Sequence, residues 1–269
     1  MALHFQAISV NLNKNTTLYE DRSVHLLYIE TTGTDAAYNF SAEEYLTRYR
    51  RFDARVLMLW QADRCVMLGN NQAAEAETDM IFASKENISI IRRSSGGGAI
   101  FTDRGTVLYT YIEALENDAK THRETAAASI IEALGTMGVN AVQEGRNDIL
   151  LEGRKISGLA QYVCGGFICT HGSLLYDTDL DMLTAVLVAD ETKLHPKGIQ
   201  SIRSRVTNIK PYIKDGSFTA AEFKARLKAA LLRDKMFKEY RFNGPELDRI
   251  EHIRREKYGN RSWTFGGTD

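Results

Sequence analysis

Three consecutive glycines constrain this chain more than any other feature of its sequence. Gly96, Gly97 and Gly98 follow an apolar, strand-like run at residues 88–92. Because glycine has no Cβ, such a run lets the backbone approach a ligand closely and turn several N–H groups toward one anion. The adjacent Arg92 and Arg93 carry bidentate donors for phosphate or carboxylate. The segment predicts an anion-binding loop. A glycine-rich hairpin or bulge with solvated arginines is the alternative interpretation of the same residues.

The glycine run differs from two common phosphate-binding motifs. No Gly-Lys-Ser/Thr follows it, so it is not a Walker A loop. No G-x-G-x-x-G opens a helix here, so it is not a dinucleotide-binding fingerprint either. A different kind of anion site is therefore indicated.

A second segment, residues 146–158, places Lys155 just after a predicted turn at Glu152-Gly153. A lysine there can project into a cleft as a point charge and neutralise a carboxylate and a phosphate brought together. Asp148 could accept a proton, hold a metal or orient an amine. A surface hairpin with solvated side chains explains this segment better when it is taken alone. Asp148 and Lys155 therefore indicate a functional site only when they are considered together with the glycine loop.

A third segment, residues 197–209, carries Lys197, Arg203 and Arg205 among small residues. This composition suits a loop that covers an anion, and it equally suits a basic solvated edge.

The overall charge excludes several classes of protein. With 34 Lys+Arg against 35 Asp+Glu, the formal net charge is −1, which argues against a nucleic-acid coat or a polybasic membrane adaptor. No apolar run approaches the roughly 18 residues that a transmembrane helix needs, and the N-terminus lacks leader character. The three cysteines lack the spacing of a structural zinc site. We expect a cytoplasmic protein with reduced thiols and no nucleic-acid or membrane partner.

The apolar patterning predicts an α+β protein with a mixed, largely antiparallel sheet and packed helices, since strands and helices alternate with hairpin-length turns. Residues 1–24 are expected to form an N-terminal arm. A helix is expected after the turn at residues 32–35, capped by Asn39 or Ser41. The next two strands, residues 55–60 and 64–71, are expected to pair. Further strands are predicted at residues 25–30, 88–92, 107–115 and 147–177, and further helices at residues 124–139, 179–188, 219–237 and 246–258.

Four ordered motifs carry a family resemblance: RRSSGGGAIF at 92–101, GRNDILLEGRKISGLAQ at 145–161, THGSLLYDTDLD at 170–181 and KGIQSIRSRVTNI at 197–209. NFSAEEY at 39–45 and REKYGNRSWTFG at 255–266 agree with them. Together they resemble the catalytic domain of lipoate-protein ligases, in the superfamily that also holds octanoyltransferases and biotin ligases. The resemblance covers residues 25–266. It implies that superfamily's mixed-sheet fold.

The resemblance also implies a reaction and its residues. Lipoate would attack the α-phosphate of ATP, with Mg²⁺, to give lipoyl-AMP and pyrophosphate; a lysine of an acceptor protein would then take the lipoyl group. Lys155 and Asp148 would be catalytic, with Asp148 a candidate for magnesium or for orienting the amine. A loop over residues 188–203 would close over the adenylate, and Phe40, Trp60 and Ile100 would help form the lipoyl slot. Substrate and ATP would contact Arg93, Gly96, Gly97, Gly98, Ala99, Ile100, Phe101, Asn147, Lys155, Gly158, His171 and Arg203.

Acceptors implied by the resemblance are apo lipoyl domains of 2-oxoacid dehydrogenase complexes and the glycine-cleavage H protein. Typical members continue into a small C-terminal domain that follows the region covered by this sequence. Three alternatives stay open: a catalytic half that needs a separate small accessory protein, a standalone variant, or a truncated piece of a longer protein. Asn70 and Thr102 replace a basic residue and a histidine that are frequent in the family. An ATP-independent lipoyl or octanoyl transferase using Cys164 or Cys169 remains an alternative, as does a non-catalytic regulator that binds lipoate or nucleotide.

Overall fold

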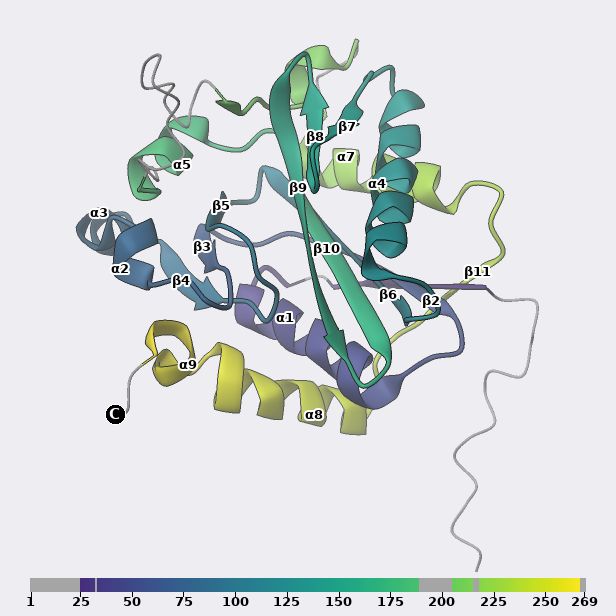
Figure 1. Ribbon diagram of the computed structural model, residues 1–269, viewed down its shortest axis with the longest axis horizontal. Helices are drawn as coiled ribbons and strands as arrows, with labels where there is room; N and C mark the ends of the chain where they lie inside the picture. Colours follow the sequence, from purple (N-terminus) through teal and green to yellow (C-terminus); the bar gives the residue numbers. More distant parts are fainter. Residues whose placement is uncertain (1–24, 32, 189–204, 215–217, 267–269) are drawn as a thin grey trace, which may run out of the picture.

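The computed structural model describes residues 25–31, 33–188, 205–214 and 218–266 (Figure 1). Within them, an eight-stranded sheet, a three-stranded sheet and packed helices form the α+β fold that the patterning predicts. The predicted N-terminal arm and residues 189–203 of the predicted covering loop, including Arg203, lie outside the described residues.

The strands are β1 Leu26–Glu30, β2 Arg55–Trp60, β3 Cys65–Leu68, β4 Ser89–Arg92, β5 Ile100–Thr102, β6 Thr106–Ala114, β7 Val142–Glu144, β8 Asp148–Leu151, β9 Arg154–Cys164, β10 Phe167–Leu175 and β11 Phe237–Glu239. The α-helices are α1 Ala36–Glu44, α2 Ala74–Glu77, α3 Met80–Lys85, α4 Ala119–Gly135, α5 Leu180–Val186, α7 Ala220–Leu232, α8 Gly244–Ile253 and α9 Arg261–Phe265. Single turns of other helix types are η1 Tyr45–Arg50, η3 Lys210–Tyr212 and η4 Arg254–Tyr258.

The large sheet has the order β11-β1-β2-β6-β10-β9-β8-β7. Only its first two pairings, β11 with β1 and β1 with β2, are parallel; every pairing from β2 to β7 is antiparallel. Successive side chains of a strand point to opposite faces, so neighbours such as Leu57 and Met58 enter different cores. Each face of the sheet therefore carries its own hydrophobic layer.

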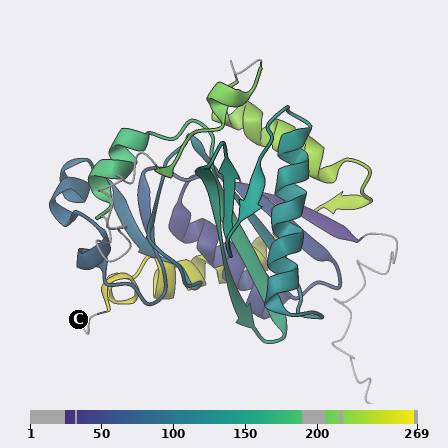
Figure 2. The same ribbon diagram turned by 45° about the horizontal axis from the view of Figure 1, so that its top comes forward.

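Helices cover both faces of the large sheet (Figures 1 and 2). On one face, α4 and α7 pack over Leu57, Tyr109 and their neighbours. On the other, α1 and α8 pack over Met58, Trp60 and Leu108. The second face also meets the small sheet, and the candidate site lies at that junction.

The small sheet corrects one prediction. β2 and β3 do not pair with each other, because both edges of β2 are already taken by β1 and β6. β3 instead pairs in parallel with β4 and antiparallel with β5. This second sheet carries the glycine loop between β4 and β5.

Two helix boundaries also differ from the predictions. The first helix is capped by Asp35, whose side chain accepts from the N–H groups of Ala37 and Tyr38. Asn39 lies inside the helix and accepts from Thr31 Oγ1 at 2.6 Å, so neither Asn39 nor Ser41 is the cap. Helix α7 ends at Leu232, and residues 237–239 form β11 beside β1 rather than continuing the helix.

The predicted turn at Glu152-Gly153 is confirmed. Both residues have positive φ, 49° and 74°, and they connect β8 to β9. This left-handed geometry matches the twist of a two-residue hairpin, and it brings Lys155 opposite β8.

Candidate functional site

A cleft between the two sheets gathers most of the residues that the sequence singles out. Its walls come from α1, β2, β3, the glycine loop, β6, the turn before β8, β9 and β10. It is lined by Phe40, Trp60, Met67, Arg93, Gly97, Gly98, Ala99, Ile100, Leu108, Asn147, Lys155, Gly158, Leu159, Ala160, His171, Gly172 and Ser173. One end is apolar and aromatic, and the other carries Lys155 and Asn147.

Arg93 organises the glycine loop from inside. Its side chain donates from Nε to Ser95 Oγ at 3.0 Å and from Nη1 to the Met67 carbonyl at 2.7 Å. Nη2 donates to the carbonyls of Gly96 and Gly98, both at 2.8 Å. Burial lowers the pKa of Arg93 to about 10, and the nearby Glu43 carboxylate opposes that shift. Three of these contacts hold the loop and the fourth attaches it to β3, so the main role of Arg93 is to give the loop its shape.

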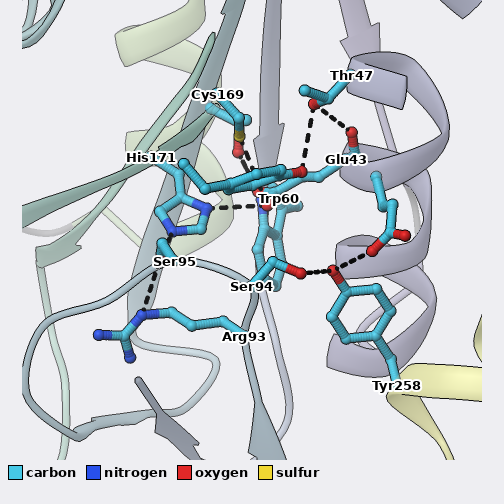
Figure 3. Close-up of polar contacts among 12 residues, drawn as sticks. Glu43, Thr47, Trp60, Arg93, Ser94, Ser95, Cys169, His171 and Tyr258 are labelled. Carbon is cyan, nitrogen blue, oxygen red and sulfur yellow. Dashed lines mark hydrogen bonds and ion pairs between the residues drawn. The ribbon is translucent and has the colours of Figure 1, made fainter. Parts of the chain in front are cut away.

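Arg92 and Ser94 attach the loop to the C-terminal helices. The Arg92 guanidinium donates to the carbonyls of Trp263 and Thr264 in α9 and also to Gly69, before α2. Ser94 Oγ lies 2.7 Å from the Tyr258 hydroxyl of η4 (Figure 3). These contacts brace the loop from behind.

The hairpin of β8 and β9 supplies charge that is open to a ligand. Lys155 Nζ lies 2.8 Å from Asp148 Oδ1, and the two side chains are 36% and 37% exposed. Asn147 Nδ2 donates to the Leu159 carbonyl at 3.2 Å. A Cβ built at Gly158 would lie 2.9 Å from Lys155 Nζ, so the missing side chain leaves the space in which the lysine lies.

The apolar end of the cleft is closed by a buried polar chain (Figure 3). His171 Nδ1 lies 2.9 Å from Glu43 Oε2, and His171 Nε2 lies 2.7 Å from Ser95 Oγ. Thr110 Oγ1 also donates to Glu43, and Trp60 Nε1 donates to Thr110 at 3.3 Å. The order serine–histidine–carboxylate resembles an activated nucleophile. Ser95, however, is fully buried and accepts a hydrogen bond from Arg93, so the chain couples the slot to the glycine loop instead.

The cysteines lack the surroundings of a reactive thiolate. Cys169 is fully buried, and burial together with Glu43 raises its pKa well above the usual value. Burial likewise raises the pKa of Cys65 to about 12. Cys164 lies at the β9–β10 turn and is absent from the lining of the cleft. A catalytic cysteine, as in the alternative transferase, therefore finds no support in this geometry.

Two places could hold a metal by their chemistry. Glu43, Cys169 and His171 offer ligand atoms within 4.8 Å of one another, but the three side chains are buried and contact one another through Glu43 Oε2. Asp148 is half-exposed; it is not one of the residues that line the cleft, but its carboxylate pairs with Lys155, which is. A single carboxylate beside substrate phosphates is the arrangement that Mg²⁺ prefers, so Asp148 fits that ion better than the buried cluster does.

The sequence predicted much of this site and missed some of it. Arg93, Gly97, Gly98, Ala99, Ile100, Asn147, Lys155, Gly158 and His171 meet in the cleft, as do the slot residues Phe40 and Trp60. Phe101 packs in a separate core with Val66 and Leu68, and Gly96 contributes a carbonyl to Arg93. Glu43 and Ser95 were not singled out. Two signals for Glu43 were available: its place in the NFSAEEY motif at residues 39–45, and an acidic pair within a largely apolar helical segment.

Comparison with known proteins explains this arrangement. The family model "Lipoyl protein ligase A/B catalytic domain" matches residues 35–232. The chain belongs to this family. The lipoate-protein ligase LplJ of Bacillus subtilis is 31% identical over 245 residues, which are 90% of this chain and 74% of that protein. Lipoate–protein ligase 1 of Staphylococcus aureus is 29% identical, over 87% of this chain and 71% of that protein.

Solved structures of lipoate-protein ligases share the fold. A bi-partite lipoate protein ligase from Thermoplasma acidophilum has a TM-score of 0.77 and 26% identity, and the match covers 92% of this chain and 98% of that one. A lipoate-protein ligase A bound with ATP has a TM-score of 0.75 and 25% identity, covering 91% and 99%. The lipoate-protein ligase fold therefore extends over nearly the whole described chain.

None of the helices that the structure describes combines the length and the apolar character needed to cross a bilayer.

Proposed function

We propose that this protein activates lipoate with ATP to lipoyl-AMP and then transfers the lipoyl group to a lysine of an acceptor lipoyl domain. The observation that carries the proposal is the cleft itself. It joins an apolar slot at Phe40 and Trp60 to a cationic end at Lys155, beside the backbone of the glycine loop at Gly97 and Gly98. A relative bound with lipoic acid and a relative bound with ATP support both substrates.

The first step brings two anions together, and the polar end of the cleft is suited to this. The lipoate carboxylate would attack the α-phosphate, and pyrophosphate would leave. Lys155 Nζ would turn from Asp148 toward the developing negative charge, because both partners are half-exposed and neither is locked by burial. Asn147 and the loop N–H groups would fix the adenylate in place.

Magnesium would neutralise phosphate charge when it is bound. We propose Asp148 as its protein ligand. The Asp148 carboxylate would then release Lys155 and bind the ion. After activation the same carboxylate would be free to orient the acceptor amine.

The acyl tail would occupy the apolar slot. Phe40 and Trp60 pack edge to face at 5.4 Å between ring centroids and form one wall. The chain Glu43–His171–Ser95 closes the far end, which sets how deep a tail can enter.

Transfer requires an acceptor, and activation, we propose, requires a separate partner protein. Apo lipoyl domains of 2-oxoacid dehydrogenase complexes and the glycine-cleavage H protein are the proposed acceptors. A bi-partite ligase from Thermoplasma acidophilum, described together with its E2 lipoyl domain, supports a separate small accessory protein for this chain as well.

One experiment tests both steps. The protein would be incubated with an apo lipoyl domain and either lipoate with Mg-ATP or preformed lipoyl-AMP, and the intact mass of the domain would be measured. A lipoyl mass gain in both tubes means that the protein is a complete ligase. Gain with the adenylate alone means that activation requires the partner. No gain in either tube contradicts the proposed function.

A further inference from the structure

Arg123, on helix α4, contacts both strand β9 and the turn that precedes β8. Arg123 is 9% exposed and is one of the residues that α4 buries. Its Nε donates to the carbonyl of Arg146 at 2.8 Å, and its Nη1 donates to Gln161 Oε1 at 3.0 Å. Arg146 lies in the turn between β7 and β8, whereas Gln161 lies on β9. A single guanidinium thus joins the turn that precedes β8 to strand β9.

The anchored carbonyl directly precedes Asn147. On its other side, the Leu159 N–H donates to the Asn147 carbonyl at 2.8 Å, and Asn147 Nδ2 returns a bond to the Leu159 carbonyl. The turn needs such anchors because its residues 145–147 lie outside the ladder, whose last pair is Glu144 with Asp148. Leu159 and Arg123 therefore fix the distance between this turn and β9.

The far partner of Arg123 is itself fixed. Gln161 Nε2 donates to Thr170 Oγ1 at 2.8 Å on β10, which turns its Oε1 toward the guanidinium. A planar guanidinium presents its donors in a fixed geometry, which a lysine cannot reproduce. The arrangement is therefore specific for arginine.

We propose that Arg123 is a positioning residue for the adenylation step, although it does not line the cleft. It acts through the Arg146 carbonyl and holds Asn147 and Asp148 at their working distance from Lys155. This inference rests on the proposed function, because it assumes that these three residues serve activation.

The test compares Arg123→Lys and Arg123→Met with Lys120→Ala. Lys120 lies on the same helix in an exposed pair with Glu124, so its variant controls for a charge lost from α4. Lipoate-dependent pyrophosphate release gives kcat and KM per folded molecule, with folding measured by thermal unfolding. Hydrogen exchange at the Leu159 amide reports the position of the turn without any activity.

We expect kcat of Arg123→Met to fall about a hundredfold, because a displacement of about 1 Å costs that much in an oriented reaction. KM for lipoate should stay within about twofold, since the acyl slot lies at the other end of the cleft, away from the turn. Arg123→Lys should recover part of the rate by bonding to one partner, and Lys120→Ala should match the wild type. The Leu159 amide should exchange faster in Arg123→Met.

A wild-type kcat in folded Arg123→Met, or an equally protected Leu159 amide, overturns the role of Arg123. A fall in kcat that disappears once rates are expressed per folded molecule would show a purely structural role and would overturn it too. If the wild type releases no pyrophosphate by itself, transfer from preformed lipoyl-AMP shows that activation requires the partner, whereas no transfer contradicts the proposed function. In both cases the exchange measurement still decides whether Arg123 positions the turn.

Discussion

The glycine loop and the lysine hairpin face each other across one cleft, yet opposite means hold them in place. In the loop, Arg93 is 5% exposed and directs its donors to carbonyls and to Ser95. In the hairpin, Lys155 and Asp148 are each more than a third exposed and form an ion pair. The loop therefore offers a fixed backbone shape, while the hairpin offers charge that can turn to a ligand.

This difference separates stability from chemistry. The buried Arg93 guanidinium is costly to remove, because its buried partners, the Met67 carbonyl and Ser95 Oγ, would lose a hydrogen bond. An exposed ion pair contributes little to folding but can stabilise charge in a transition state. Substitutions in the two regions should therefore affect different measurements.

The largest effect is expected for Lys155→Ala. Loss of this cation should lower the rate of pyrophosphate release by about a thousandfold, while the free energy of unfolding changes by less than about 1 kcal/mol. Steady-state kinetics and urea unfolding measure the two quantities. Lys210→Ala is the matched control, because Lys210 pairs with Asp177 at similar exposure outside the cleft. Full activity of Lys155→Ala would refute its proposed role.

Arg93→Lys should lower stability first, and activity only as a result. An ammonium has too few donors for the contacts with Met67, Gly96, Gly98 and Ser95, so the free energy of unfolding should fall by about 3 kcal/mol. Activity should fall as a consequence of the disordered loop. Urea unfolding measures the change, with Arg104→Lys in an exposed pair as the control. An unchanged urea midpoint would show that the loop does not depend on the hydrogen bonds of Arg93.

Gly158→Ala sharpens the comparison inside the hairpin. The new Cβ would meet the flexible end of Lys155, which can move aside, so stability should hold while the adenylation rate falls about tenfold to a hundredfold. Gly172→Ala provides the contrast, since its Cβ would meet the buried Tyr109 ring and the Gly158 carbonyl. That variant should lower the thermal midpoint. Equal thermal effects of the two substitutions would contradict this assignment.

The smallest effect is expected at the hairpin turn. Glu152 has φ of 49°, which an asparagine adopts more readily than a glutamate does. Glu152→Asn creates an Asn-Gly turn of the preferred hairpin type and should stabilise the fold by about 0.5 kcal/mol without altering kcat. Thermal unfolding measures the gain, and Glu152→Val should move the midpoint in the opposite direction.

The sequence predicted the parts of the site that lie close together along the chain. Asn147, Asp148 and Lys155 lie in or next to one hairpin, and the turn residues Glu152 and Gly153 predict that hairpin. The glycine run likewise predicts its own loop. Local backbone preferences decide such features, so a single segment is enough to predict them.

The missed residues act over long separations. Arg123 meets a carbonyl of a later turn, and Glu43 meets His171 on a strand 128 positions away. The pairing of β3 with β4 rather than β2 was missed for the same reason. No local pattern encodes which strand edge or buried donor is still unsatisfied once the rest of the chain has packed.

By itself, the sequence determined the α+β class, the hairpin that carries Lys155 and the glycine-rich loop, because hydrophobic period, positive-φ turns and glycine content are properties of short segments. The tertiary structure alone decided that Arg93 faces inward to hold the loop, and that Lys155 remains open to the cleft. Both are cations in the sequence. Their roles differ because burial forces the first to satisfy carbonyls, whereas partial exposure leaves the second able to change partner.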